Sequence, residues 1–201
     1  LLAGLAPRGE PGRLLHDTEI ANVGLYGFGV KSFTLSMIEA ALAATGGRLP
    51  ASLIGEIMTL GRAMLTHPVD PFPGVQETLE ALKPAHKLLV VTRGDLVDQE
   101  RKLAASGLLP FFDEIEIVSD KTEAVYERIF SRHGNGPDRA MMVGNSMRAD
   151  VLPALAAGAW AVHVPSEHVW SLDLADDPTG SARFRRLPRV AEVLPLVAAI
   201  G

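Results

Sequence analysis

One stretch of the chain, residues 139–165, constrains the fold more than any other. It reads R-A-M-M-V-G-N-S-M-R-A-D-V-L-P-A-L-A-A-G-A-W-A-V-H-V-P. The apolar run 140–143 is too short for a helix and stops at Gly144, which predicts a buried strand that ends in a tight loop. A short helix is expected next, with Asp150 as its N-cap, and then a second strand over 159–164. Strand, helix and strand in this order predict a parallel α/β unit.

The periodicity of the apolar residues changes near residue 70. Helical patterns dominate before it, and strands alternate with helices after it. Helices are expected over 33–44, 51–65, 75–83 and 120–132, and strands over 87–91 and 114–118. We therefore expect an α/β fold with two parts: residues 1–70 form an inserted helical cap, and residues 71–201 form a Rossmann-like core with a parallel sheet.

Composition excludes several classes of function. The chain has 201 residues, of which 47% are hydrophobic, so it can bury a sizeable core. It has no cysteine, which excludes disulfides and thiolate zinc sites. The net charge is -5, and the densest basic cluster, 183–186, is interpreted as solvated surface, so no nucleic-acid partner is expected. No apolar run is long enough to span a bilayer and no signal peptide is visible, so a cytoplasmic protein without a membrane partner is expected. The oligomeric state is not indicated.

Polar residues follow three of the expected strands. Thr92 ends one strand, Lys121 follows the next, and Asn145 and Asp150 lie in the loop after the third. In an open parallel sheet, the carboxyl ends of the strands meet at the ligand-binding edge. A hydroxyl, an ammonium and an oxygen-rich loop suit phosphate or carboxylate chemistry, which depends on positioning and charge neutralisation. The two oxygen-bearing side chains of the loop are candidate ligands for Mg²⁺.

Each of these residues also has a simpler interpretation. A threonine at a strand end is usually a cap, a lone lysine is usually solvated, and Asp150 is by default an N-cap. Taken together, however, they indicate a site. Two interpretations also apply to the segment with Gly27, Gly29 and Lys31. The backbone at the glycines could approach an anion, and Lys31 could close over a phosphate or carboxylate. For the two glycines, a hinge or tight helix packing is the preferred interpretation.

Residues 73–165 resemble the haloacid dehalogenase-like (HAD) hydrolases. The resemblance rests on L-L-V-V-T ending at Thr92, on S-D-K ending at Lys121 and on the loop G-N-S-M-R-A-D over 144–150. The segment F-P-G-V-Q-E-T-L-E-A-L also looks like the family's return from a C1-type helical cap into the core.

The resemblance implies roles for individual residues. Thr92 would orient the phosphoryl group, and Lys121 would hold the charges of nucleophile and phosphate together. Asn145 and Asp150 would place Mg²⁺. Substrate binding would involve Thr92 together with the residues that follow it and with the cap, namely Arg93, Gly94 and Lys31.

The chain departs from the family pattern in two places. The first family motif, D-x-D-x-T after a strand, carries the nucleophilic aspartate and is absent; Asp17-Thr18 lacks both the strand and the second aspartate. The expected place of this motif is upstream of Leu1. In addition, Asn145 stands where the magnesium loop usually begins with aspartate, which weakens the metal site or shifts its charge to the missing motif.

These observations favour a magnesium-dependent phosphatase that acts on a small phosphorylated metabolite through an aspartyl-phosphate intermediate. Two alternatives remain open. One is an inactive HAD-fold protein that binds an anion. The other is a metal-independent haloacid dehalogenase, because dehalogenases of this superfamily also carry asparagine in this loop, although their spacing from asparagine to aspartate is shorter.

Overall fold

The protein is described by a computed structural model over residues 11–167 and 170–200. The chain divides into two compact units. The first, which we call the helical unit, comprises residues 1–69 and 93–105, and the second, the sheet unit, comprises residues 70–92 and 106–201. Residues 1–10 and 201, which belong to the expected cap and core, lie outside the described residues.

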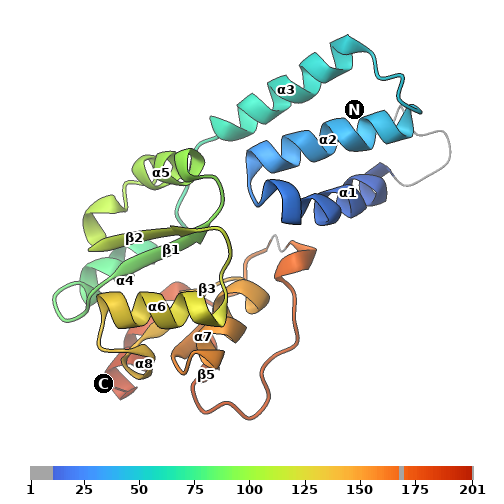
Figure 1. The fold of residues 1–201 in the computed structure, drawn as a ribbon. Coiled ribbons are helices and arrows are strands. Elements are labelled where there is room, and N and C mark those ends of the chain that lie inside the picture. The colour runs from blue at the N-terminus through green and yellow to red at the C-terminus, as the bar shows by residue number, and fades with distance from the viewer. Residues whose placement is uncertain (1–10, 168–169, 201) are drawn as a thin grey trace. The chain divides into compact units, whose positions relative to one another are not determined.

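The helical unit consists of helices, and those of residues 11–65 share a small apolar core. Its helices are α1 (Pro11–Tyr26), α2 (Val30–Ala44), α3 (Ala51–Leu65) and α5 (Leu96–Ala105). The first three lie side by side (Figure 1). Met37, Ala41 and Ile57 are buried where α2 meets α3. The expected helices over 33–44 and 51–65 are therefore present, although α2 begins earlier than expected, at Val30.

The sheet unit alternates strands and helices. Its strands are β1 (Leu89–Arg93, with Arg93 assigned to the helical unit), β2 (Glu114–Val118), β3 (Met141–Gly144), β4 (Trp160–His163) and β5 (Phe184–Arg186). Its helices are α4 (Val75–Leu82), α6 (Glu123–His133), α7 (Leu152–Ala156) and α8 (Val193–Ile200). β4 pairs in parallel with β3 and with β5, which confirms the predicted α/β class with parallel strands.

The strands of this unit form two separate sheets among the described residues. One has the order β1-β2 and the other β3-β4-β5. β1 and β3 therefore each keep one edge without a hydrogen-bonded strand in the part of the chain that the structure describes. β4 has strands on both sides and is almost wholly buried, whereas the equally apolar β1 and β3 are only partly buried.

An apolar cluster joins helices and strands of the sheet unit. Tyr126 of α6, Val151 and Ala154 pack against Ala161 of β4, and all four are buried. Val91 of β1 packs against the same cluster. The loop that follows β3 is thus fixed against the core, which is what positions the polar residues described below.

Two details differ from the sequence expectations. Helix α6 begins at Glu123 rather than at 120, because the Thr122 side chain accepts a hydrogen bond from the backbone N–H of Val125 and caps it. The basic segment 183–186 includes a strand, β5, which the sequence did not predict because its three residues show no apolar alternation.

Asp150 is not an N-cap, contrary to the expectation. Residues Met147–Val151 form a turn of π-helix that leads into α7, and the cap is Ser146, whose Oγ accepts a hydrogen bond from the backbone N–H of Ala149 at 3.0 Å. Asp150 lies inside this turn and is 4% exposed, which leaves its carboxylate available for other partners.

Among residues 11–167 and 170–200, no helix combines the length and apolar character needed to cross a membrane.

Candidate active site

The centre of the candidate site is an ion pair between Lys121 and Asp150. Lys121 Nζ lies 2.7 Å from Asp150 Oδ1, and the two side chains are 11% and 5% exposed. Lys121 stands three positions after the last residue of β2, and Asp150 lies in the turn that follows β3. The structure therefore brings together two of the residues that the sequence singled out.

The other oxygen of Asp150 is held by the backbone of its own loop. The N–H of Ser146 donates to Asp150 Oδ2 at 3.0 Å. This carboxylate also packs so closely on Gly144 that a Cβ at residue 144 would lie 2.2 Å from Oδ2. Glycine at the end of β3 is thus required by close approach, and it fixes where the Asp150 carboxylate sits.

Three side chains from elsewhere in the unit hold the same loop. The Tyr126 hydroxyl donates to the carbonyl oxygen of Ala149 at 3.1 Å. His163 Nε2 lies 3.0 Å from the carbonyl oxygen of Asn145, and since a carbonyl only accepts, Nε2 carries the proton. The Ser146 hydroxyl donates to Asp173 Oδ1 at 2.7 Å. The loop is therefore rigidly placed by contacts to α6, β4 and the segment after β4.

The sequence did not predict these supporting residues. Tyr126 and His163 sit in apolar patterns where a core position is the ordinary interpretation, and Asp173 lies 27 positions from its partner in a segment without periodicity. The order of the strands could have suggested His163, since β4 pairs with β3 and the two lie in register at Gly144 and His163. No local signal marks Asp173.

Asn145, the other expected metal ligand, makes different contacts. Its Nδ2 donates to Ser166 Oγ at 3.4 Å, so the carboxamide oxygen is the atom it can offer to a cation. Both oxygens of Asp150 already have partners, and the described residues contain no group of three or more histidine, cysteine, aspartate or glutamate side chains that could hold a metal ion. The described residues do not by themselves make a magnesium site.

Thr92 lies in β1, partly buried, next to the boundary between the two units. Its strand pairs with β2, the strand that leads to Lys121. Arg93 and Gly94, the other expected substrate-binding residues of this segment, belong to the helical unit. Gly94 has φ +141°, a conformation that favours glycine, and a Cβ there would also lie 2.9 Å from Gln99 Nε2.

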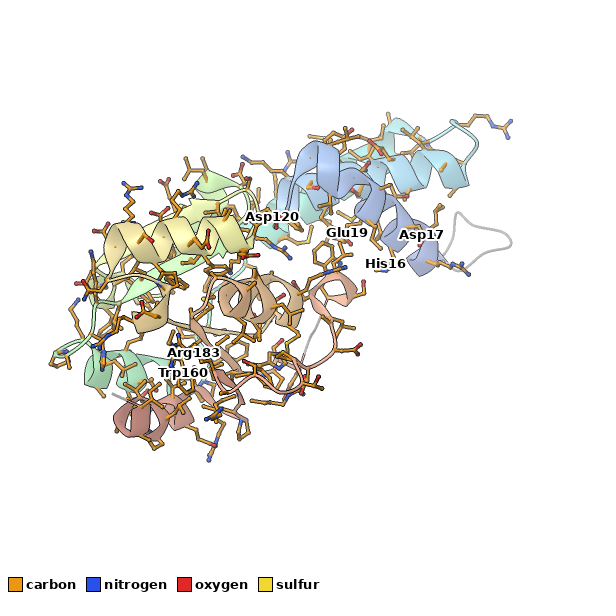
Figure 2. The ribbon with its side chains drawn as sticks, turned by 60° about the horizontal axis from the view of Figure 1, so that its bottom comes forward. His16, Asp17, Glu19, Asp120, Trp160 and Arg183 are labelled. Atoms are coloured by element: carbon orange, nitrogen blue, oxygen red, sulfur yellow. The ribbon has the colours of Figure 1, made fainter. Side chains whose placement is uncertain are left out.

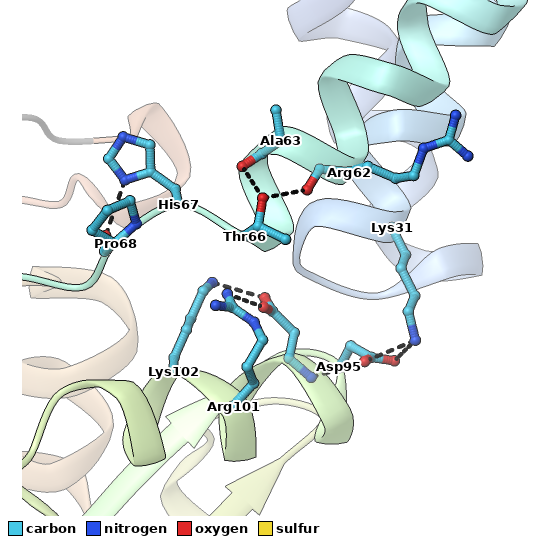
Figure 3. Close-up of polar contacts among 10 residues, drawn as sticks. Lys31, Arg62, Ala63, Thr66, His67, Pro68, Asp95, Arg101 and Lys102 are labelled. Atoms are coloured by element: carbon cyan, nitrogen blue, oxygen red, sulfur yellow. Dashed lines mark hydrogen bonds and ion pairs between the residues drawn. The ribbon is translucent and has the colours of Figure 1, made fainter.

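In the helical unit, Lys31 is joined to Asp95. Lys31 Nζ lies 2.9 Å from each carboxylate oxygen of Asp95 (Figure 3). Asp95 Oδ1 also accepts the backbone N–H of Asp98 at 3.1 Å, so Asp95 caps the start of α5. The hydrogen bond from Lys31 is the main reason why the pKa of Asp95 lies below its ordinary value.

A second contact joins the same two segments of the helical unit. The Arg93 guanidinium carbon lies 3.8 Å from the centre of the Phe28 ring, within the range of a cation–π interaction. Gly27 to Gly29 link α1 to α2, so the glycines serve as a turn in the structure. Segments 28–31 and 93–95 are therefore joined by two contacts, one from Lys31 to Asp95 and one from Arg93 to Phe28.

Asp17 does not resemble a nucleophile in the structure. It lies on the surface of α1, where Arg13 Nε is 3.8 Å away and both side chains are largely exposed (Figure 2). The neighbouring Thr18 hydroxyl donates to the carbonyl oxygen of Leu14 within the same helix. This agrees with the sequence interpretation, which rejected Asp17-Thr18 as the missing motif.

Comparison with known proteins bears on this arrangement. A family model described as haloacid dehalogenase-like hydrolase matches residues 19–158. A crystal structure of a haloacid dehalogenase-like family hydrolase from Xanthomonas campestris is similar, with 38% sequence identity and a TM-score of 0.80, over 92% of this chain and 74% of that one.

Two curated relatives have names that state an activity. A glyceraldehyde 3-phosphate phosphatase from Methanothermobacter thermautotrophicus is 36% identical over 104 residues, which are 48% of this chain and 46% of that protein. A phosphoglycolate phosphatase from Caulobacter vibrioides is 32% identical over 142 residues, which are 64% of this chain and 58% of that protein. The chain thus spans about half the length of the curated relatives it matches.

Proposed function

Because the chain belongs to the haloacid dehalogenase-like hydrolases, we propose that it is part of a phosphatase that acts on a small phosphorylated metabolite. The observation that carries the proposal is the buried pair of Lys121 and Asp150, set in a loop that is held on several sides. A buried ammonium next to a site for a dianion neutralises charge that develops during phosphoryl transfer. The names of two relatives, both phosphatases of small phosphate esters, support the same class of substrate.

In this proposal each residue has one task. An aspartate attacks phosphorus and the alcohol leaves, and water then releases phosphate from the aspartyl-phosphate. Thr92 donates to a phosphoryl oxygen, and Lys121, held by Asp150, balances the negative charge of nucleophile and phosphate. Arg93, Gly94 and Lys31 contact the substrate. Residues 1–70 act as the cap and residues 71–201 as the core, in a cytoplasmic enzyme.

The attacking aspartate is proposed to lie on a further strand, N-terminal to Leu1, that pairs with both β1 and β3. Two features of the sheet unit support this. Each of these strands has one edge without a partner among the described residues, and each is apolar but only partly buried. Unpaired edges of apolar strands are unusual in folded proteins because they invite association. A strand between them would end near Lys121 and Asn145.

Magnesium remains part of the proposal, with a restricted role for this chain. Asn145 offers one neutral oxygen, and the Asp150 carboxylate is already shared between Lys121 and Ser146. The carboxylates that Mg²⁺ prefers would have to come from the further strand. The bound ion would supply positive charge to the phosphoryl oxygens; the steps assigned above to Thr92 and Lys121 do not depend on it.

The test uses the protein with its native N-terminal sequence. Phosphate release from phosphoglycolate, glyceraldehyde 3-phosphate and p-nitrophenyl phosphate is measured with and without Mg²⁺. Lys121→Ala is expected to abolish release, while Lys87→Ala, which removes an exposed lysine of the same unit, is expected to leave it unchanged. Normal turnover by the Lys121 variant would refute the assignment.

The same experiment separates the alternatives. Binding of phosphate without any turnover would favour the inactive binding protein. Halide release from 2-chloropropionate without metal would favour the dehalogenase. Asn145, which stands where the magnesium loop usually begins with aspartate, is the observation that supports this alternative.

A further inference from the structure

We propose that Asp173 is a positioning residue of the candidate active site and that it acts through the hydroxyl group of Ser146. Its carboxylate fixes the direction of the Ser146 O–H. The loop that carries Asp150 is thereby held in the geometry that aims this residue at Lys121. The effect on turnover rests on the proposed phosphatase function, whereas the effect on the loop does not depend on it.

Ser146 fastens the loop that follows β3. Its backbone N–H donates to Asp150 Oδ2 at 3.0 Å, and its carbonyl oxygen accepts the backbone N–H of Asp150 at 2.9 Å. Its hydroxyl oxygen accepts the backbone N–H of Ala149 at 3.0 Å. Ser146 is 5% exposed, so water competes little for these bonds. Because Ser146 holds both the backbone and the carboxylate of Asp150, a displacement of Ser146 moves both.

Asp173 determines how the Ser146 hydroxyl is used. A hydroxyl has one proton to donate and two lone pairs, and an ionised carboxylate can only accept. The Ser146 O–H therefore points at Asp173 Oδ1, 2.7 Å away, and a lone pair remains for the N–H of Ala149. Such a bond to a carboxylate is about twice as strong as one between neutral groups. Since its proton is committed to Asp173, the Ser146 hydroxyl does not donate to a substrate phosphate.

The connection that carries Asp173 has an unusual form. Residues 164–183 join the parallel strands β4 and β5, and the described part of this connection, 164–167 and 170–183, contains a short 3₁₀ turn, Ser171–Asp173, but no α-helix or strand. Connections longer than about 15 residues without such elements are uncommon and are usually functional. The N–H of Asp173 donates to the carbonyl oxygen of Trp170 at 2.9 Å, which closes the turn and fixes the residue. Holding the loop after β3 is a function that this connection can serve.

The position of Asp150 matters for the proposed reaction through Lys121. Asp150 Oδ1 lies 2.7 Å from Lys121 Nζ, and this ammonium is proposed to balance charge that develops during phosphoryl transfer. A misplacement of about 1 Å, even one caused far from the reacting atoms, can cost about 100-fold in rate. Loss of the Asp173 contact should therefore lower kcat. KM should stay nearly constant, because neither Asp173 nor the Ser146 hydroxyl is proposed to contact the substrate.

The kinetic test uses the protein with its native N-terminus and p-nitrophenyl phosphate with Mg²⁺. Asp173→Ala is expected to lower kcat about 10- to 100-fold and to leave KM within about twofold. Asp173→Asn keeps an oxygen that can accept the Ser146 O–H, so its kcat should return to within about fivefold of wild type. In the background of Ser146→Ala, which removes the hydroxyl, Asp173→Ala should have no further effect.

Hydrogen exchange provides a second readout that does not require activity. Asp173→Ala should speed exchange of the Ala149 amide at least about tenfold relative to the Ala161 amide of β4, which reports on the stability of the whole unit. Asp173→Asn should leave this ratio within about threefold of wild type. Asp176→Ala, which removes an exposed aspartate of the same connection, is the control and should match wild type in both assays. Should Asp173→Ala not fold, Asp173→Ser, whose hydroxyl is too short to replace the carboxylate, takes its place.

Three results would refute the inference. The first is wild-type kcat and wild-type Ala149 exchange in Asp173→Ala. The second is a loss in Asp173→Asn as large as that in Asp173→Ala, which would show that the charge acts and not the accepted hydrogen bond. The third is a rise in KM that matches the fall in kcat/KM, which would mean a direct contact with substrate. If the wild-type protein hydrolyses no ester, the phosphatase proposal fails, and the exchange of the Ala149 amide in the same variants still decides whether Asp173 holds the loop.

Discussion

Asp150→Asn is expected to destabilise the sheet unit by about 3 kcal/mol. The change leaves the ammonium of Lys121 without its counterion in a place where only 11% of the side chain is exposed. Removing one partner of a buried pair costs about 3–5 kcal/mol, and the lower end applies here because Lys121 keeps some contact with water. The carboxamide oxygen can still accept the N–H of Ser146, so that hydrogen bond adds little to the loss.

The pair can be isolated by a double-mutant cycle. Lys121→Met should cost a similar amount, since it leaves the Asp150 carboxylate buried without a cation. The double variant leaves no lone charge, so its loss should fall short of the sum of the single losses by at least about 2 kcal/mol.

Urea-induced unfolding followed by tryptophan fluorescence measures this energy, because both tryptophans, Trp160 and Trp170, belong to the sheet unit. The control cycle uses Lys87 and Glu114, whose side chains are 45% and 42% exposed. Its coupling energy should not exceed about 0.5 kcal/mol. If the coupling of Lys121 and Asp150 were equally small, the pair would be solvated and the reasoning from burial would be wrong.

Three other predictions follow from the contacts described above. Gly144→Ala should cost about 1–3 kcal/mol of stability and most of the turnover, because its Cβ would overlap Asp150 Oδ2. The control is Gly55→Ala inside α3, whose Cβ meets nothing within 4 Å; it should not lower stability and should raise it by up to about 1 kcal/mol. Asn145→Asp should tighten Mg²⁺ binding in calorimetry, and unchanged affinity would show that this side chain does not contact the ion. The Lys31 hydrogen bond lowers the pKa of Asp95 in the folded protein. The pair therefore stabilises the helical unit fully at pH values above the ordinary aspartate pKa of about 3.9. This stabilisation is lost as the pH falls through the lowered pKa. The stability difference between wild type and Asp95→Asn, followed by far-UV circular dichroism, should therefore shrink in acid, and a difference that grows there would contradict the sign.

The strands, and the polar residues that follow them, could be predicted because each depends on a short stretch of sequence. The apolar run before Gly144 and the run before Thr92 each form a strand, and the polar residues after them lie where a parallel sheet places ligands. The partnership of Lys121 with Asp150 was within reach as well, because both follow strands and their charges are opposite.

Longer-range contacts were beyond this reasoning. Lys31 and Asp95 are 64 positions apart, and neither shows by its neighbours which residue it will meet. The role of Asp150 was misjudged for a related reason. An aspartate before a helix is a good cap, but here the buried ammonium of Lys121 offers its carboxylate a stronger partner, and Ser146 caps the turn instead.

The division of the strands into two sheets has a consequence for how the protein acquires its site. Lys121 follows β2, which belongs to one sheet, while Ala149 and Asp150 follow β3, which belongs to the other. The ion pair and the hydrogen bond from Tyr126 to Ala149 thus join the two sheets. These contacts form only when both sheets are in place, because each one has a partner that follows a different sheet. A chain in which only one of the two sheets has formed therefore lacks the ion pair, however much secondary structure it has.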